Sequence, residues 1–274
     1  MPFRRLPLVK REVDDPSIEH AWFAPNRGES ALAPLHVRVV SWNIALGIRL
    51  SAVNRHLSSA KNLKRADVLA LQEVSRTRRT SQARTLAAEL KMNYVYAGAH
   101  RCQLARERGQ AILSPHPILR AWRIVLPRVR HPRIALAADI QIGPDVVRVV
   151  NVHLENRTRI NPFIIKRRAA QMSFLLDWLE TAGHARTILA GDLNTLGFIV
   201  DRGRSEILTE MLEAAGYSDA HPGETRSTHR PLWSRLDYIF TRHARTVRGA
   251  IENTGRLSDH FAVWADVELL EHIA

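Results

Sequence analysis

The chain has 274 residues and a formal net charge of +13 at pH 7, with 45% hydrophobic and 24% charged residues. This hydrophobic content excludes a wholly disordered chain, and the length allows one or two domains with a sizeable core. No apolar run approaches the roughly 20 residues that a membrane helix needs. The N-terminal segment lacks the continuous apolar stretch of a secretory signal. The single cysteine, Cys102, excludes an internal disulfide and favours a reducing, cytoplasmic setting. We expect a monomer.

The positive charge comes almost entirely from arginine, with 35 Arg against 5 Lys. An excess of this size is typical of proteins with an anionic partner, such as nucleic acid, a phosphorylated small molecule or an acidic membrane surface. The alternative is a general compositional preference for arginine that serves no partner. Composition alone leaves both interpretations open.

Residues 1–35 contain five prolines and no sustained hydrophobic period. They predict an irregular N-terminal extension, packed across the domain by Trp22 and Phe23. Residues 36–274 then form one domain.

The rest of the chain alternates between strand and helix patterns. The predicted strands are 37–43, 66–72, 94–98, 110–114, 120–125, 133–142, 146–154, 187–192, 235–241, 246–252 and 261–269. The predicted helices are 51–64, 76–90, 162–182 and 205–215. Turn residues at 143–145 join two of the strands in a hairpin. Many strands, some paired directly and some linked by helices, predict two packed sheets with helices outside.

Six segments share one form, in which polar side chains that can act as ligands or catalysts follow an apolar strand or lie at its edge. They are SWN (41–43), LQE (71–73), NVH (151–153), GDLN (191–194), RLDY (235–238) and SDH (258–260). Strand ends at one edge of a sandwich converge, so these residues can build one pocket. Carboxylate and amide oxygens suit Mg²⁺ or Mn²⁺ better than zinc. Taken singly, each segment is also explained as a turn or a helix cap.

The order of these segments resembles the endonuclease/exonuclease/phosphatase superfamily, the group related to pancreatic deoxyribonuclease. The matching segments are VVSWNI (39–44), DVLALQEV (67–74), GQAILSPHPI (109–118), VVNVHLE (149–155), ILAGDLNT (188–195), SRLDYIF (234–240) and LSDHFAVWADV (257–267). The resemblance implies an α/β fold, a four-layer α/β/β/α sandwich with two mixed β-sheets flanked by helices. It also implies metal-dependent hydrolysis of a phosphate ester.

The resemblance further implies which residues hold the metal and activate water. Glu73 matches the family's main ligand for Mg²⁺ or Mn²⁺, and Asn43 matches the asparagine beside it. Asp259 is expected to be a metal-site carboxylate or to hold His260 in place. Asp192 matches the residue that orients or deprotonates the attacking water.

The remaining family positions concern the phosphate. His260 is expected to contact the phosphate and to stabilise the charge that builds in the transition state. Asp237 resembles the carboxylate that orients an active-site histidine and favours its imidazolium form. Asn194 would hold the phosphate or the nucleophile. His153 would be a second phosphate-binding or general-acid imidazole.

Arginines cluster in the loops and helix starts that adjoin this predicted edge. They lie at 76–79, 101–108, 157–168 and 226–230. Arg108, Arg157 and Arg168 are predicted to bind substrate together with Asn194 and His153, because arginine suits bidentate phosphate contacts. For Arg168 the alternative is the solvated face of an amphipathic helix.

The sequence therefore predicts a divalent-metal-dependent phosphodiesterase acting on nucleic acid. The segment around His153 differs from the tyrosine-containing segment of the abasic-site repair branch, which argues against that branch. One alternative is a phosphatase or phosphodiesterase of a lipid headgroup, an inositol phosphate or another small phosphoester. Another is a non-catalytic nucleic-acid-binding homologue.

Overall fold

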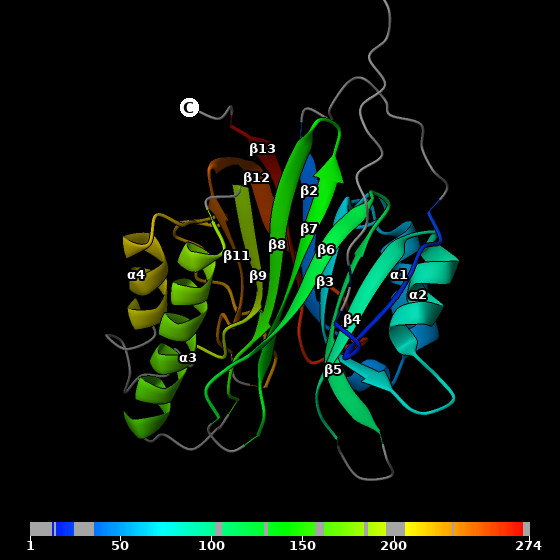
Figure 1. Ribbon diagram of the computed structural model, residues 1–274, viewed down its shortest axis with the longest axis horizontal. Helices are drawn as coiled ribbons and strands as arrows, with labels where there is room; N and C mark the ends of the chain where they lie inside the picture. Colours follow the sequence, from blue (N-terminus) through cyan, green and yellow to red (C-terminus); the bar gives the residue numbers. More distant parts are fainter. Residues whose placement is uncertain are drawn as a thin grey trace, which may run out of the picture.

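In the computed structural model, two mixed β-sheets lie face to face and helices cover the outer face of each (Figure 1). The structure describes residues 13, 15–24, 36–101, 106–128, 131–156, 162–183, 186–195, 206–231 and 233–270. This four-layer α/β/β/α sandwich confirms the predicted fold class. Among the described residues, no helix is long and apolar enough to cross a membrane.

The first sheet has seven strands. Their order across the sheet is β1 (Ile18–Ala21), β4 (Asn93–Arg101), β5 (Glu107–Ser114), β3 (Val68–Arg76), β2 (Val37–Asn43), β13 (Ala262–Leu269) and β12 (Ala244–Glu252). Two helices, α1 (Leu50–Ser59) and α2 (Gln82–Leu90), cover its outer face. A short 3₁₀ turn, η1 (Ala45–Gly47), follows β2.

The second sheet has six strands. Their order is β10 (Ser218–Asp219), β11 (Asp237–Arg242), β9 (Arg186–Asp192), β8 (Asp145–His153), β7 (Ile134–Ile142) and β6 (Ile118–Val125). Its outer face is covered by α3 (Pro162–Thr181) and α4 (Glu206–Ala214), on the opposite side of the molecule from α1 and α2 (Figure 1).

Alternation along the strands divides the apolar side chains between the layers. In β2, Val37 and Val39 are buried between the two sheets, whereas Val40 and Trp42 are buried against α1 and α2. This follows from the two-residue period of a strand, which sends neighbouring side chains to opposite faces. The same alternation fixes the strand register, because a one-residue slip would reverse every side chain.

Several predicted boundaries differ from the structure; the predicted helix 51–64, for example, ends at Ser59, and the predicted strand 94–98 extends to Arg101. Residues 18–21, inside the predicted irregular extension, form β1 and pair with β4, while Trp22 and Phe23 pack on the domain as expected. The predicted helix 76–90 begins only at Gln82. β3 continues to its end at Arg76, a turn follows, and the Ser81 hydroxyl accepts from the backbone N–H of Arg84 as a helix cap.

The strand arrangement gathers the polar strand ends at one edge. β2 and β3 are parallel in one sheet, and β8 and β9 are parallel in the other. The ends of β2 and β9 meet where Asn43 contacts Asp192, so the carboxyl ends of both pairs lie at the same edge of the sandwich, where the predicted site residues stand.

Below this edge a buried polar contact joins the two sheets. Asn151 of β8 is fully buried, and its Nδ2 donates to the carbonyl oxygens of Leu71 and Ala111, each at 2.9 Å. Its Oδ1 accepts from Gln72 Nε2 at 2.8 Å. The amide therefore satisfies groups on both β3 and β5 and fixes the sheets relative to one another.

Replacing Asn151 with Leu is expected to lower the free energy of unfolding by about 3 kcal/mol or more, because two buried carbonyl oxygens and Gln72 Nε2 each lose a hydrogen bond. The midpoint of urea unfolding measures this change. Arg120→Leu, an exposed substitution on β6, is the control and should shift the free energy by less than about 0.5 kcal/mol. Equal free energies of unfolding for Asn151→Leu and Arg120→Leu would contradict the role of Asn151 in joining the two sheets.

Candidate active site

Three site residues stand side by side on the six-stranded sheet. His153 ends β8, Asp192 ends β9, and Asp237 begins β11. The register pairs His153 with Asp192 and Asp192 with Asp237. All three side chains are buried. Strand pairing alone therefore brings an imidazole and two carboxylates together.

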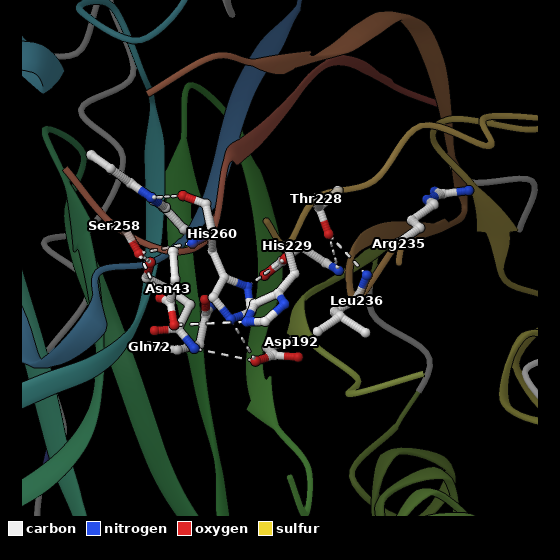
Figure 2. Close-up of polar contacts among 12 residues, drawn as sticks. Asn43, Gln72, Asp192, Thr228, His229, Arg235, Leu236, Ser258 and His260 are labelled. Atoms are coloured by element: carbon white, nitrogen blue, oxygen red, sulfur yellow. Dashed lines mark hydrogen bonds and ion pairs between the residues drawn. The ribbon is translucent and has the colours of Figure 1, made fainter. Parts of the chain in front are cut away.

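The side chains converge on one carboxylate oxygen, Asp192 Oδ2. Asn43 from the other sheet donates to it through Nδ2 at 3.2 Å. His153 Nε2 lies 3.5 Å from it, and His260 Nε2 lies 3.7 Å from it. The opposite ring nitrogen of His260, Nδ1, lies 2.8 Å from Asp237 Oδ2. Figure 2 shows Asn43, Asp192 and His260 pointing toward one another.

The environment gives these groups different charge states near neutral pH. Burial lowers the pKa of His260, but the charges of Asp237 and Asp192 outweigh it and raise the pKa to about 10. Burial raises the pKa of Asp192 to about 6, although His260 opposes that shift. Burial and the charge of Arg133 hold the pKa of His153 well below its usual value. The site thus combines an imidazolium, a carboxylate able to accept a proton, and a neutral imidazole.

Hydrogen bonds to the backbone hold His260 in place. The carbonyl oxygen of His260 accepts from Trp42 Nε1 at 3.1 Å and from the Thr254 hydroxyl at 3.0 Å. Its N–H donates to the Ser258 hydroxyl, which itself donates to the carbonyl oxygen of Asn43 at 2.7 Å (Figure 2). The loop before β13 is thereby fixed to the end of β2.

The strand that carries Asp237 is held in a similar way. The Thr228 hydroxyl accepts from the backbone N–H groups of Leu236 and Asp237, at 2.8 and 3.0 Å (Figure 2). His229 follows Thr228, and its ring meets that of His260 edge-on with centroids 4.5 Å apart.

Two site residues have a backbone conformation that is unusual for a side-chain-bearing residue. Glu73 has φ 57° at a bulge in β3, and Asn194 has φ 53° just after β9. The Asn194 N–H donates to Asp192 Oδ1 at 2.9 Å, and its Nδ2 donates to the carbonyl oxygen of Leu154 at 3.0 Å. Bulges redirect side chains, and strained residues concentrate at functional sites. These conformations support a functional role for both residues.

Replacing Asp237 with Asn is expected to let burial lower the pKa of His260, so that the ring is neutral at pH 8. Activity at pH 8 should then fall about 100-fold or more, because a preorganised positive charge is lost. The deficit should narrow as the pH is lowered and the ring regains its proton. A pH–rate profile, with an NMR titration of His260, measures both effects. An unchanged His260 titration would contradict the assigned pairing.

Comparison with known proteins identifies the family. The Endonuclease/Exonuclease/phosphatase family matches residues 40–260, which span the site from Asn43 to His260. The chain belongs to the endonuclease/exonuclease/phosphatase family. It is therefore a phosphohydrolase of this family. No curated protein matches the sequence significantly.

Solved structures of the endonuclease/exonuclease/phosphatase fold are similar along most of the chain. One is the endonuclease/exonuclease/phosphatase from Beutenbergia cavernae, with TM-score 0.71, 19% identity, and coverage of 88% of this chain and 74% of that one. Another is the human Nocturnin catalytic domain with bound sulfate, with TM-score 0.67, 17% identity, and coverage of 86% and 96%. The 3′ phosphatase NExo from Neisseria, bound to product DNA hairpin, has TM-score 0.64, 22% identity, and coverage of 84% and 98%. These likenesses support the family fold.

The Glu73 carboxylate fits the divalent metal that the family implies. Among the described residues it accepts no hydrogen bond, and its nearest cation is Arg108 Nη1 at 3.5 Å. Its oxygens remain available to a hard cation, and the amide oxygen of Asn43 adds a second donor of the right kind.

Two further groups bring possible metal-ligand atoms within 4.8 Å of one another. They are His229, Asp259 and His260, and Asp192, Asp237 and His260. Both groups include His260, and a protonated imidazole has no lone pair for a metal. Glu73 and Asn43 instead offer oxygen donors, which suit Mg²⁺ or Mn²⁺ better than an imidazole does. Asp259 is half exposed beside His229, and a hydrogen bond from that ring lowers its pKa to about 2. Its place in the metal site stays a prediction.

The predicted substrate-binding arginines have different surroundings. Arg108 lies beside Glu73 at the site. Arg168 is buried, so the alternative of a solvated helix face is wrong. Its Nε donates to the carbonyl oxygen of Glu155 at 2.7 Å. This contact anchors the chain just after His153, and binding of substrate by Arg168 stays a prediction. Arg157 lies outside the described residues.

Sequence reasoning missed one charged residue at the site, Arg133. It directly precedes β7, and its charge acts on Asp192, Glu73 and His153. No motif marks this arginine. The predicted hairpin did indicate where this arginine lies. Counting back along both strands from the turn at 143–145 places residue 133 opposite the residue that follows His153.

Proposed function

We propose that this protein is an Mg²⁺- or Mn²⁺-dependent phosphodiesterase that hydrolyses nucleic acid. The observation that carries the proposed chemistry is the buried arrangement of Asp237, His260 and Asp192. It sets a fixed imidazolium 3.7 Å from a carboxylate whose pKa is raised to about 6. Attack of water on a phosphate needs a base that accepts the proton of the water and a positive charge that stabilises the developing negative charge.

Each residue has a defined task in this reaction. Asp192 orients water and accepts its proton, while Asn43 and the Asn194 N–H hold the carboxylate. His260 neutralises charge that develops on the phosphate oxygens. His153 offers a neutral ring for a hydrogen bond. A metal held by Glu73 and Asn43 would supply Lewis-acid stabilisation of the phosphate.

The charge distribution supports nucleic acid as the substrate. Beyond Glu73, four exposed arginines continue outward from β3, β4 and β5, and they are Arg78, Arg79, Arg101 and Arg106. Exposed positive charges beyond the catalytic residues suit a polymer with many phosphates better than a small ester. The similar Neisseria phosphatase is described as bound to a DNA hairpin, which agrees with this choice.

A substrate panel tests the proposal. Purified protein is incubated with single-stranded DNA, duplex DNA, RNA, inositol phosphates and sphingomyelin, each with Mg²⁺, Mn²⁺ or EDTA. We expect cleavage of at least one nucleic acid with either metal and none in EDTA. Hydrolysis of only the inositol phosphates or sphingomyelin would show that the substrate is a small or lipid ester and not nucleic acid. Binding of nucleic acid without any cleavage would support the non-catalytic alternative.

A further inference from the structure

Arg133 is a buried arginine whose side chain lacks the protein partners that buried charges normally have. Its side chain is 4% exposed, and its Nε has no hydrogen-bond partner among the described residues. The guanidinium makes no ion pair in the described part of the chain. Buried charges in proteins are normally paired and hydrogen-bonded.

Arg148, in the neighbouring strand β8, shows the usual arrangement. It is equally buried, but its Nε and Nη2 donate to the two oxygens of Asp139 at 2.8 and 3.1 Å. The fold thus supplies a bidentate carboxylate for one buried arginine and none for the other. Burial lowers the pKa of Arg133 even though Glu155, Asp192 and Glu73 attract its charge. Replacing Arg133 with an apolar side chain of similar size is therefore expected not to destabilise the fold.

Arg133 directly precedes β7, which pairs with β8, the strand that ends at His153. Its charge interacts with Glu73 and Asp192, which the proposed mechanism uses, and with Arg108. Arg108 is a second guanidinium with an incomplete set of contacts, because its buried Nε also lacks a hydrogen bond among the described residues. Both guanidiniums thus have an Nε donor without a hydrogen bond among the described residues, and their charges interact with each other.

We propose that Arg133, with Arg108, forms an anion subsite that binds the non-bridging oxygens of a substrate phosphate. A phosphate supplies the acceptors that the protein does not, and guanidinium donors match its oxygens in pairs. In the six-stranded sheet, β7 lies on one side of β9, and β11, with the Asp237 that binds His260, lies on the other. We therefore place the phosphate between Arg133 and His260. As a substrate contact this rests on the proposed function, but phosphate binding by Arg133 is testable without any reaction.

The experiment measures binding of inorganic phosphate to the full chain at pH 8 in EDTA, by isothermal titration calorimetry. Arg133→Met keeps the length of the side chain and removes its charge and donors. Its Kd for phosphate should rise about 10- to 100-fold, as expected for lost charge-assisted hydrogen bonds. Arg120→Met, which removes one exposed arginine from the far half of β6, should bind as the wild type does.

A stability measurement separates this role from a structural one. Without phosphate, Arg133→Met should unfold at a Tm equal to or above that of the wild type, because an unpaired buried charge is removed. Where Arg133→Met does not fold, Arg133→Lys tests the same point, since it keeps the charge but loses the paired donors. Unchanged phosphate affinity in the variant that folds would overturn the subsite, as would a wild type that binds no phosphate. Absence of ester hydrolysis, with phosphate binding that depends on Arg133, would refute the proposed function alone.

Discussion

Asp192→Asn is expected to lower kcat/KM for phosphodiester cleavage by about 100- to 10,000-fold, the range for loss of a general base. The Asn side chain keeps the size of the carboxylate, but its single oxygen can keep only one of the two hydrogen bonds that Asp192 accepts, from Asn43 at Oδ2 and from the Asn194 N–H at Oδ1. It cannot take the proton of the attacking water. Activity should therefore fall with little change in KM, measured by initial rates over a range of substrate concentration.

The same variant should not lose stability. Burial raises the folded-state pKa of Asp192 from 3.8 to about 6, so ionisation of this group destabilises the fold as the pH rises through that range. An uncharged Asn removes the penalty, and the Tm at pH 8 should equal or exceed that of the wild type. Asp177→Asn, an exposed substitution on α3, is the matched control and should leave activity and Tm unchanged. Near-wild-type activity of Asp192→Asn would show that Asp192 is not the general base.

Glu73→Gln is expected to weaken Mn²⁺ binding by about 100-fold or more, because even residues that only support a metal ligand are worth 10- to 100-fold in affinity. Gln preserves the length of the side chain at the bulge in β3, but one anionic oxygen is replaced by an NH₂ group that cannot bind a cation. Titration of Mn²⁺ followed by electron paramagnetic resonance measures the affinity directly. Activity should become undetectable at metal concentrations that saturate the wild type, and higher metal should restore part of it.

Glu213→Gln on the exposed face of α4 is the control for this variant, since it removes the same charge far from β3. Equal Mn²⁺ affinity of wild type and Glu73→Gln would exclude Glu73 as the ligand. The His/Asp groups around His260 would then become the stronger candidates for the metal.

Most of the fold could be predicted from the sequence because its strands are strongly patterned. Buried strands such as 66–72 and 187–192 are continuous in apolar residues and end in polar ones, so both the strand and its functional end are visible. The start of α2 was misplaced because the arginines and threonines after Arg76 suit a helix as well as a turn, and only pairing with β5 extends β3 that far. β1 was missed because a four-residue edge strand has too few positions to establish a period.

The site was predictable as a set of residues but not as an arrangement of charges. The resemblance singled out His260, Asp237 and Asp192, yet the protonation of His260 depends on its 2.8 Å contact with Asp237 and on burial. The hairpin register could place Arg133 near His153, but the significance of this residue lies in a missing partner. A sequence cannot show that a guanidinium is buried beside the site and left without a protein carboxylate.

The proposed reaction requires a divalent metal and Asp192, and a metal titration of phosphodiester cleavage tests both requirements together. Protein stripped with EDTA is titrated with Mg²⁺ while cleavage of a labelled oligonucleotide is followed, in parallel for wild type and Asp192→Asn. We expect no cleavage without metal and a saturable rise in rate for the wild type. The rate for Asp192→Asn should be lower by a factor of about 100 or more at every Mg²⁺ concentration. Cleavage that persists in EDTA, or that is equally fast in Asp192→Asn, would contradict the proposed reaction.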